Sequence, residues 1–230
     1  MQPYSFPYLG YFNLINSCDK FVFLDDANFI NKGWINRNYI LLNEQPHRFT
    51  IPLIKSSQNS LIRDIRIDIS SNFFNKFKKT LHYSYSKAPN FQSTMQIIYS
   101  SISEENKFIS ELAINSIKSI CSYIGIRKEF HNSSSLSKKF SQCFGENRLI
   151  EITRLLGGKE YINLPGGKEI YSKEVFKKNG INLNFINPLL PKYNQFNNTG
   201  DFISNLSIID ILMNVNHNEI ERLIKVYEKV

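Results

Sequence analysis

The amino-acid sequence predicts an α/β fold with a mainly parallel three-layer sheet, an inserted helical region and a β-hairpin. Late in the chain, short apolar runs alternate with helical segments of about ten residues, which is typical of βαβ units and a parallel sheet. Residues 70–125 carry apolar side chains at helical spacing. Two strand-like runs flank a turn at residues 43–46. We therefore expect one α/β domain over residues 1–230, with residues 70–125 as a helical insertion or subdomain.

Strand-like runs dominate the first seventy residues, after one short helix. That helix is predicted over residues 10–17, between Pro7 and Asp19. The strands are predicted at residues 21–24, 38–42, 48–53 and 65–69. The first strand is apolar and ends in two carboxylates, Asp25 and Asp26, so we expect a buried strand whose carboxyl end meets solvent.

The middle of the chain is predicted to be helical, and the last part alternates helices with strands. Periodic apolar side chains predict helices at residues 72–83, 90–101 and 104–125. The remaining strands are predicted at residues 127–131, 160–163 and 183–186. The remaining helices are predicted at residues 147–156, 171–179, 206–215 and 218–228. This order favours parallel pairing of the late strands.

Charge and cysteine content narrow the class of protein. Lys plus Arg minus Asp plus Glu gives 28 − 20 = +8. The positive residues are scattered and form no basic stripe interleaved with aromatic residues, so nucleic acid is not the expected partner. Cys18, Cys121 and Cys143 are odd in number and contain no CxxC pair, so we expect free thiols rather than disulfides or a zinc site.

The hydropathy of the chain bears on its location. No apolar stretch approaches the roughly 18 residues that a membrane span requires. Residues 1–12 contain no basic segment and no small-residue cleavage site, unlike a signal peptide. We therefore expect a cytoplasmic protein without a membrane span.

The predicted sheet indicates where a ligand would bind. In open parallel sheets, ligands sit beyond the carboxyl ends of the strands. This rule places Asp25 and Asp26, residues 131–135 and residues 163–167 around one crevice. The loop at residues 164–168 lacks the spacing of a phosphate cradle, so it is either a tight turn or a secondary substrate loop.

Two histidines are candidates for acid/base chemistry. His82 lies beside Tyr83 in a predicted helix, and His131 lies at a predicted strand end. Neither has metal-ligand spacing to a second histidine or cysteine. The alternative for each is a structural histidine with satisfied hydrogen bonds, which is the commoner role.

The first twelve residues combine rigid backbone with aromatic side chains. Pro3, Pro7 and Gly10 surround Tyr8 and Tyr11 at the predicted start of a helix. A helix start is a ready anion site. The same pattern also fits an ordinary turn whose aromatic side chains belong to the core, and the sequence leaves both interpretations open.

A polar and charged loop follows the carboxylate pair. Residues 28–37 bring Lys32, Trp34, Asn36 and Arg37 close together in the sequence. Lys and Arg bind phosphates or carboxylates, and Trp offers a flat face for a base or a sugar. The alternative is a surface loop with structural ion pairs. We favour a ligand site, because these groups follow the strand end where the sheet rule expects one.

Blocks of residues along most of the chain resemble the WbqC-like family. The blocks are QPYSFPYLGYF at 2–12, FLDD at 23–26, Lys32 with WINRN at 34–38, Tyr85 with KAP at 87–89, Phe91, SS at 134–135, NRL at 147–149, Tyr161, PGG at 165–167, Tyr171, Tyr193, Gln195, Phe202 and LSIID at 206–210. They occur in order as far as Asn214, which makes the resemblance specific.

The resemblance implies a role in bacterial surface-polysaccharide biosynthesis, such as O-antigen. It implies a transferase that adds a small acyl or aminoacyl group to a nucleotide-linked amino sugar. The alternative is a non-catalytic nucleotide- or sugar-binding accessory protein of the same pathway. The first block also looks distantly like the phosphate-binding turn of class I nucleotidyltransferases, which implies a nucleotidyltransferase-like outline by analogy alone. The cofactor stays unknown, with ATP and Mg²⁺ or an acyl donor as the alternatives.

The family pattern and the residue chemistry together define the expected site. The catalytic candidates are Asp25, His82 and His131. The substrate-binding candidates are Gln2, Tyr8, Gly10, Tyr11, Asp26, Asn28, Lys32, Trp34, Asn36, Arg37, Lys87, Arg148, Tyr193, Gln195 and Asp210. In this interpretation Asp25 positions a hydroxyl group or Mg²⁺, Lys32 and Arg37 neutralise phosphate, and Trp34 stacks on a ring.

One departure from the family concerns the start of the sequence. Relatives carry a short apolar segment before Gln-Pro, which is the natural first strand, whereas Met1 directly precedes Gln2 here. Either the start is misassigned or that strand is shortened. We expect the sheet to lack its central element.

Overall fold

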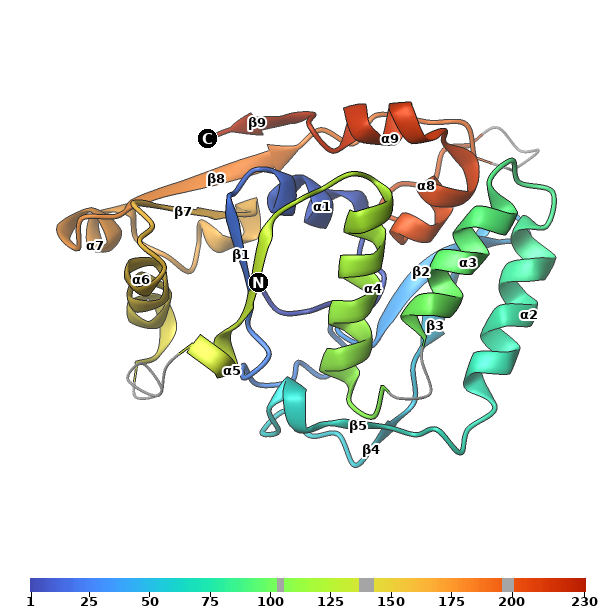
Figure 1. Ribbon diagram of the computed structural model, residues 1–230, viewed down its shortest axis with the longest axis horizontal. Coiled ribbons are helices and arrows are strands. Elements are labelled where there is room, and N and C mark those ends of the chain that lie inside the picture. The colour runs from blue at the N-terminus through green and yellow to red at the C-terminus, as the bar shows by residue number, and fades with distance from the viewer. Residues whose placement is uncertain (103–105, 137–142, 196–200) are drawn as a thin grey trace.

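A mixed α/β arrangement forms the computed structural model in Figure 1, which describes residues 1–102, 106–136, 143–195 and 201–230. The helices are α1 (Leu9–Asn16), α2 (Phe73–Tyr85), α3 (Phe91–Ser101), α4 (Ile109–Tyr123), α5 (Ser133–Leu136), α6 (Gly145–Leu155), α7 (Lys173–Lys178), α8 (Ile208–Asn214) and α9 (His217–Leu223). The strands are β1 (Lys20–Phe23), β2 (Arg37–Leu42), β3 (Gln45–Thr50), β4 (Leu53–Ile54), β5 (Arg66–Ile67), β6 (Glu129–Asn132), β7 (Glu160–Asn163), β8 (Asn182–Pro188) and β9 (Tyr227–Lys229). Two short 3₁₀ turns are η1 (Ile62–Asp64) and η3 (Pro165–Gly167).

The first strand pair is parallel, as the sequence predicts. Strand β1 pairs with β6, and Phe21 and Phe23 lie opposite Phe130 and Asn132. The Phe23 and Phe130 rings stack with centroids 5.6 Å apart. Because strand side chains alternate between faces, these phenylalanines cover one face of the pair and anchor it in the core.

The late strands form a second, separate sheet. Strand β7 pairs with β8 in parallel, and β8 pairs with β9 antiparallel. The helix predicted over residues 218–228 ends at Leu223, and Tyr227–Lys229 is strand β9 instead. The free edge of β8 offers backbone hydrogen bonds to this last segment, and that tertiary pairing overrides its helical pattern.

The continuous, mainly parallel sheet predicted from the sequence does not form. Within the described residues the strands make four small sheets, with two parallel and three antiparallel pairings. A cleft of about 480 Å³ separates β1 from β7, so the two parallel pairs share no backbone hydrogen bonds across it. The α/β class is confirmed, and the single sheet is corrected to several small ones.

The predicted hairpin is confirmed as β2 and β3. The two strands are antiparallel and turn at Asn43 and Glu44, both of which have positive φ. That geometry is the preferred two-residue hairpin turn. The strand predicted over residues 65–69 is shorter, since β5 covers two residues and Ile69 is 68% exposed.

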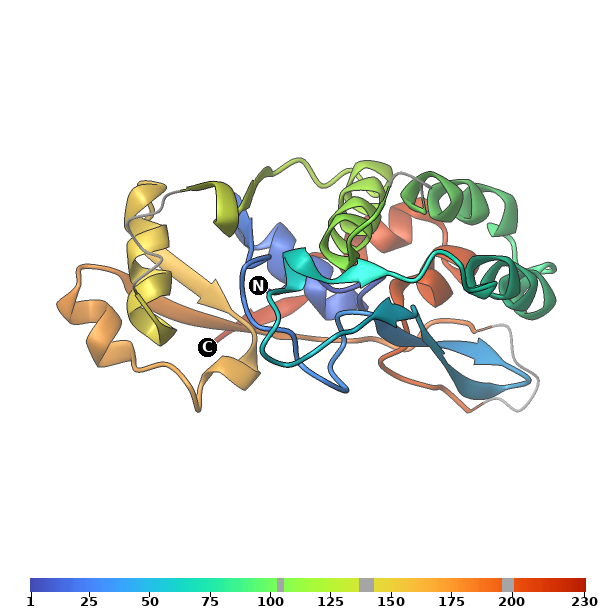
Figure 2. The same cartoon turned by 90° about the horizontal axis from the view of Figure 1, so that it is seen from below.

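Residues 70–125 contain helices α2, α3 and α4. The start predicted for the last helix, residues 104 and 105, lies outside the described residues, and α4 begins at Ile109. Its predicted apolar stripe is confirmed as core, because Leu112, Ile117 and Ile120 are fully buried. Figure 2 shows α8 between α3 and the hairpin, and contacts to both join these layers into one core.

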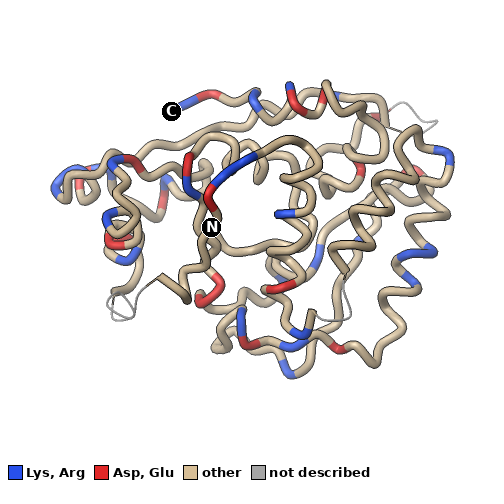
Figure 3. The backbone as a smooth tube through the Cα atoms, in the orientation of Figure 1, with Lys and Arg blue, Asp and Glu red and all other residues tan. Residues whose placement is uncertain are grey.

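Charges and thiols are distributed without clustering in the described parts of the chain. Figure 3 shows Lys and Arg spread over both ends of the molecule and interspersed with Asp and Glu. The three cysteines are free, as predicted, and Cys121 is buried. No helix in the ranges that the structure covers is both long and apolar enough to cross a membrane.

Candidate functional site

Two adjacent carboxylates stand at the shared carboxyl end of β1 and β6. Asp25 follows β1 and is 4% exposed, and Ser133 and Ser134 follow β6 at the start of α5. One oxygen of Asp25, Oδ1, accepts hydrogen bonds from the Ser134 amide at 3.0 Å and from Ser133 Oγ at 3.2 Å. Its other oxygen accepts from Ser134 Oγ at 2.5 Å. Parallel pairing therefore joins two segments more than a hundred residues apart into one polar edge.

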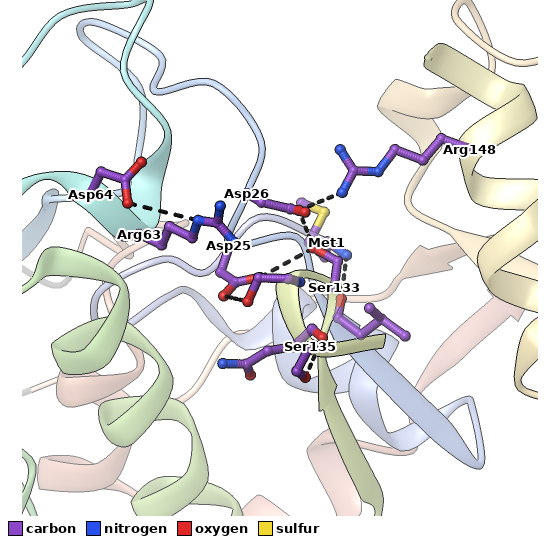
Figure 4. Close-up of polar contacts among 11 residues, drawn as sticks. Met1, Asp25, Asp26, Arg63, Asp64, Ser133, Ser135 and Arg148 are labelled. Atoms are coloured by element: carbon purple, nitrogen blue, oxygen red, sulfur yellow. Dashed lines mark hydrogen bonds and ion pairs between the residues drawn. The ribbon is translucent and has the colours of Figure 1, made fainter. Parts of the chain in front are cut away.

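Two arginines flank the carboxylate pair. Arg148 of α6 donates from Nη2 to Asp26 Oδ1 at 2.5 Å, and the single hydroxyl proton of Ser133 lies within reach of this oxygen as well as of Asp25 Oδ1. Figure 4 shows Arg63 of η1 and Arg148 approaching the pair from opposite sides. The side chains of Asp26 and Arg148 are 18% and 21% exposed, so a ligand could reach both.

The hydrogen bonds at this edge bear on metal binding. Both oxygens of Asp25, and Oδ1 of Asp26, already accept from hydroxyl, amide or guanidinium donors. Mg²⁺ requires oxygen ligands whose lone pairs face the ion rather than a donor. The described residues include no group of three or more acidic, histidine or cysteine side chains placed to hold a metal ion. Asp25 therefore does not fit as a ligand of Mg²⁺ in this arrangement.

The two candidate histidines lie in different parts of the molecule. His131 lies on β6, two residues before Ser133, and its Nε2 is 2.8 Å from Glu129 Oε1. His82 is exposed on α2 and packs edge-on against Phe91. Figure 1 places α2 at the far end of the molecule from β6, so the structure brings His131, and not His82, near the carboxylate pair.

The opening segment is mainly buried. Tyr11 is fully buried, and its hydroxyl donates to the Gln2 carbonyl at 2.8 Å. A Cβ atom on Gly10 would lie 2.4 Å from the Tyr8 ring and 3.1 Å from Pro188. These contacts give Gly10 and Tyr11 a packing role and favour the interpretation of this block as a turn with core aromatics.

Phe6 shows how firmly the opening turn is held. Its φ is 49°, which is strained for a residue with a side chain. Its carbonyl accepts from Asn38 Nδ2 at 2.8 Å and from Ser207 Oγ at 2.7 Å, and its amide donates to Ser116 Oγ at 3.2 Å. Side chains from three distant elements therefore converge on the backbone of one residue and hold it in the unusual conformation.

The charged loop after the carboxylate pair is anchored by its own backbone contacts. Arg37 Nε donates to the Gly33 carbonyl at 2.8 Å, and Asn36 Nδ2 donates to the Ile51 carbonyl at 2.8 Å. Trp34 is 48% exposed and meets Tyr39 edge-on. Lys32 is exposed and has a φ of 62°. The loop therefore presents a cation and an indole to solvent.

The start of this loop contacts the first residues. Gln2 Nε2 donates to the Asn28 carbonyl at 3.2 Å, and Asn28 forms an antiparallel bridge with Leu61. The exposed side chain of Asn28 follows Asp26 by two residues. Gln2 and Asn28 therefore lie on one surface segment that leads away from the carboxylate pair.

Three predicted site residues meet in a buried network elsewhere. Asp210 of α8 is fully buried and accepts from the hydroxyls of Tyr85 at 2.8 Å and Tyr193 at 2.6 Å. Gln195 Nε2 donates to the same carboxylate at 3.2 Å. Burial raises the pKa of Asp210, and the donors counteract it. The Leu41 amide completes the network by donating to Tyr85, so its members tie α2, α8 and β2 together.

Lys87 completes the set predicted from the sequence. It is exposed in the turn just after α2. In that turn the Ala88 amide donates a hydrogen bond to the Tyr85 carbonyl at 2.8 Å. It therefore lies close in sequence to the buried network and in the part of the molecule that Figure 1 places away from β6.

A family model described as the WbqC-like protein family matches residues 2–222 of this chain. The chain belongs to the WbqC-like family. One relative, named Uncharacterized protein Rv1507c, from Mycobacterium tuberculosis, is 27% identical over 214 residues. That alignment covers 91% of this chain and 89% of the relative. No solved structure matches the chain.

The match confirms the resemblance to the WbqC-like family, and the structure adds members to the polar edge. Ser133, Ser134 and Arg63 contact or flank the carboxylate pair and were not among the predicted site residues. The two serines could have been selected, because the sheet rule already placed residues 131–135 at this edge. No sequence pattern pointed to Arg63, since a short 3₁₀ turn and the two-residue strand after it place this residue beside the carboxylate pair.

Proposed function

We propose that this protein is a transferase of surface-polysaccharide (O-antigen) biosynthesis that adds a small acyl or aminoacyl group to a nucleotide-linked amino sugar. One observation carries the proposal: Asp25, Asp26, Ser133, Ser134 and Arg148 meet where two parallel strands end. In α/β proteins ligands bind at such edges. Membership of the WbqC-like family supports the pathway. The proposal places the protein in the cytoplasm with a nucleotide-linked sugar as its substrate.

The residues at the edge suit different parts of that substrate. Arg148 is partly exposed and can exchange its bond to Asp26 for the diphosphate, which a guanidinium binds in a bidentate manner. The sugar amino group then attacks the acyl carbon of the donor, the bond from that carbon to the donor's leaving group breaks, and the leaving group departs with the electron pair. Asp26, released from Arg148, accepts the proton that the amino group loses. Asp25 is buried and accepts hydrogen bonds from Ser133 and Ser134, so it acts as a positioning residue for these serines.

The donor of the transferred group is left open by the proposal. An acyl donor and ATP both remain candidates, and ATP is included because the opening block looks like a nucleotidyltransferase phosphate turn. A nucleotidyltransferase-like, three-layer outline is part of the same proposal. No step through Mg²⁺ is derived, because donors already occupy both oxygens of Asp25 and one oxygen of Asp26.

Substitution of Arg148 tests the binding step. We expect Arg148→Ala to weaken binding of a uridine-diphosphate amino sugar at least tenfold, because a hydrogen bond to a charged group contributes about 1.5–3 kcal/mol. Binding is measured by isothermal titration calorimetry, and circular dichroism reports whether the fold survives. Arg37→Ala, at the start of β2, is measured alongside and is also expected to weaken binding at least tenfold.

The matched control is Arg222→Ala. Arg222 also binds one carboxylate, Glu219, but on the exposed surface of α9. We expect its removal to leave nucleotide-sugar affinity unchanged. Equal affinities for the wild type, Arg148→Ala and Arg222→Ala would remove Arg148 from the site, and absence of any nucleotide-sugar binding by the wild type would refute the proposal.

The second candidate function is a non-catalytic nucleotide- or sugar-binding accessory protein. The environment of Asp25 favours it, because this carboxylate is 4% exposed and accepts hydrogen bonds from Ser133 and Ser134, which limits its contact with a substrate. A mass-spectrometric screen of amino-sugar nucleotides with ATP, amino acids and acyl-coenzyme A separates the two functions. Any group transfer that Asp26→Asn abolishes excludes the accessory role, whereas binding without turnover excludes the enzyme.

A further inference from the structure

The hydroxyl group of Ser134 is held by a carboxylate from a distant part of the chain. Ser134 Oγ donates to Asp25 Oδ2 at 2.5 Å, and the Ser134 amide donates to Asp25 Oδ1 at 3.0 Å. These two bonds fix both the backbone and the side chain of Ser134 against one carboxylate. Asp25 is 4% exposed, whereas Ser134 is partly exposed, so the serine is the member of this pair that a substrate can contact.

The partner of Ser134 distinguishes it from the other serines. In the described parts of the chain, two other serines donate to a carboxylate. Ser70 is exposed and bonds to a carboxylate two residues away, and Ser133 is only 1% exposed. The next hydroxyl along the chain, that of Ser135, donates to the Asn132 carbonyl. Ser134 therefore combines a partly exposed hydroxyl with a proton acceptor that tertiary contacts hold in place.

A serine bonded to an oriented carboxylate has the arrangement of an activated nucleophile. A hydroxyl group becomes nucleophilic when a base within hydrogen-bond reach takes its proton and a third group orients that base. Asp25 is the acceptor here, and Ser133 Oγ, 3.2 Å from Asp25 Oδ1, helps to orient it. The histidine on the same strand end, His131, is paired with Glu129 instead. The carboxylate is therefore the group that receives the proton of Ser134.

We propose that Ser134 is a covalent nucleophile that carries the acyl group during transfer, an inference that rests on the proposed function and deepens it. Ser134 Oγ attacks the acyl carbon of an activated acyl donor, the bond from that carbon to the leaving group breaks, and the leaving group departs with the electron pair. The hydroxyl proton passes to Asp25 Oδ2, which already accepts a hydrogen bond from Ser134 Oγ. An acyl ester of Ser134 remains.

The second half of the transfer uses the neighbouring carboxylate. The sugar amino group attacks the ester carbon, the bond from that carbon to Ser134 Oγ breaks, and Oγ takes the proton back from Asp25. Asp26 accepts the proton that the amino group loses. The Ser133 hydroxyl lies within reach of both carboxylates, as Figure 4 shows, so the two proton acceptors are one side chain apart. The ester of Ser134 is therefore the acyl donor that the amino group attacks.

A fluorophosphonate probe tests the nucleophile in the full chain without any sugar substrate. The probe forms a bond from phosphorus to an activated serine oxygen and loses fluoride. We expect peptide mass spectrometry to find the label on Ser134, and we expect Ser134→Ala to abolish labelling. Asp25→Asn should slow labelling at least about tenfold, because the carboxamide does not take up the hydroxyl proton. The matched control, Ser135→Ala, removes a neighbouring hydroxyl that donates to a backbone carbonyl and should be labelled at the wild-type rate.

Two outcomes overturn the proposal. One is equal labelling of the wild type and Ser134→Ala. The other is a wild type that neither the fluorophosphonate nor p-nitrophenyl acetate, a smaller acyl donor, modifies at Ser134. If circular dichroism shows that Asp25→Asn does not fold, the comparison of Ser134→Ala with Ser135→Ala still decides the result.

This test and the binding test of the proposed function fail separately. Labelling requires no nucleotide sugar, and calorimetry of the wild type and Arg148→Ala requires no reactive serine. Nucleotide-sugar binding without labelling would refute the covalent step and leave direct transfer, whereas labelling without nucleotide-sugar binding would refute the proposed substrate and retain the nucleophile.

Discussion

Gly10 shows how a single residue serves packing at the opening turn. The sequence left open whether its small size permits a phosphate to approach or a helix to pack. The structure favours packing, because the space that a side chain at this position would need is filled by Tyr8 and Pro188. Proline and glycine in this block therefore place the aromatic residues of the core.

Gly10→Ala is expected to destabilise the protein by about 1–3 kcal/mol, because overpacking a filled site forces neighbours out of position. The Tyr8 ring, which would lie 2.4 Å from the new methyl group, must move first. Urea unfolding measures the change. Gly166→Ala is the control, since no atom lies within 4 Å of its added Cβ, and it should be neutral. Equal effects of the two substitutions would contradict the packing role.

At the scale of elements, α8 joins the opening turn to the hairpin. Ser207, which precedes α8, donates from Oγ to the Phe6 carbonyl and accepts from the Ile209 amide at 3.3 Å. Its own amide donates to the Tyr39 carbonyl at 2.8 Å. One helix cap therefore connects three segments that are far apart in the sequence.

Ser207→Ala is expected to lower the free energy of unfolding by about 1.5–3 kcal/mol, because it removes a cap and a buried hydrogen bond together. Ser172→Ala provides the comparison, since Ser172 caps α7 at 3.5 Å on the exposed surface. Its loss should cost about 1 kcal/mol or less. Chemical denaturation measures the free energy of unfolding of both variants. A loss in Ser172→Ala as large as that in Ser207→Ala would argue against a stabilising role for the hydrogen bond from Ser207 to the Phe6 carbonyl.

For the molecule as a whole, buried tyrosines control stability at alkaline pH. Burial raises the pKa of each member of this group above the usual 10.0: Tyr4, Tyr8, Tyr11, Tyr85, Tyr161, Tyr171 and Tyr193. Above pH 10 the unfolded chain loses these protons while the folded protein keeps them. The folded state then binds more protons, so stability falls as pH rises.

The free energy of unfolding should fall steeply above pH 10. For Tyr4, whose pKa is raised to about 12, the loss extends from pH 10 to 12. Tyr4 alone accounts for roughly 2–3 kcal/mol, because a tenfold change in equilibrium corresponds to about 1.4 kcal/mol. Urea unfolding at pH 8 to 11.5 measures the slope, which Tyr4→Phe should reduce. A flat profile above pH 10 would show that these groups titrate normally.

The local elements followed from the sequence because local patterns encode them. The apolar run before Asp25, the turn at Asn43 and Glu44, and the stripe along α4 each have their expected form. The family and the α/β class were also predicted correctly. Periodicity, turn residues and ordered motif blocks are properties of neighbouring residues, so they are visible without a structure.

Most hydrogen bonds and strand pairings between residues far apart in the sequence were decided by the tertiary structure. No local pattern indicated that Asp210 would bind two tyrosines in the core or that Tyr227 would begin a strand, whereas the rule for parallel sheets had already placed residues 131–135 beside Asp25. The sequence placed β1 and β7 in one sheet, whereas the structure leaves a cleft between them. Pairing depends on which backbone edges are brought within hydrogen-bonding distance by the packing of the whole chain, and that distance is not encoded in any single segment.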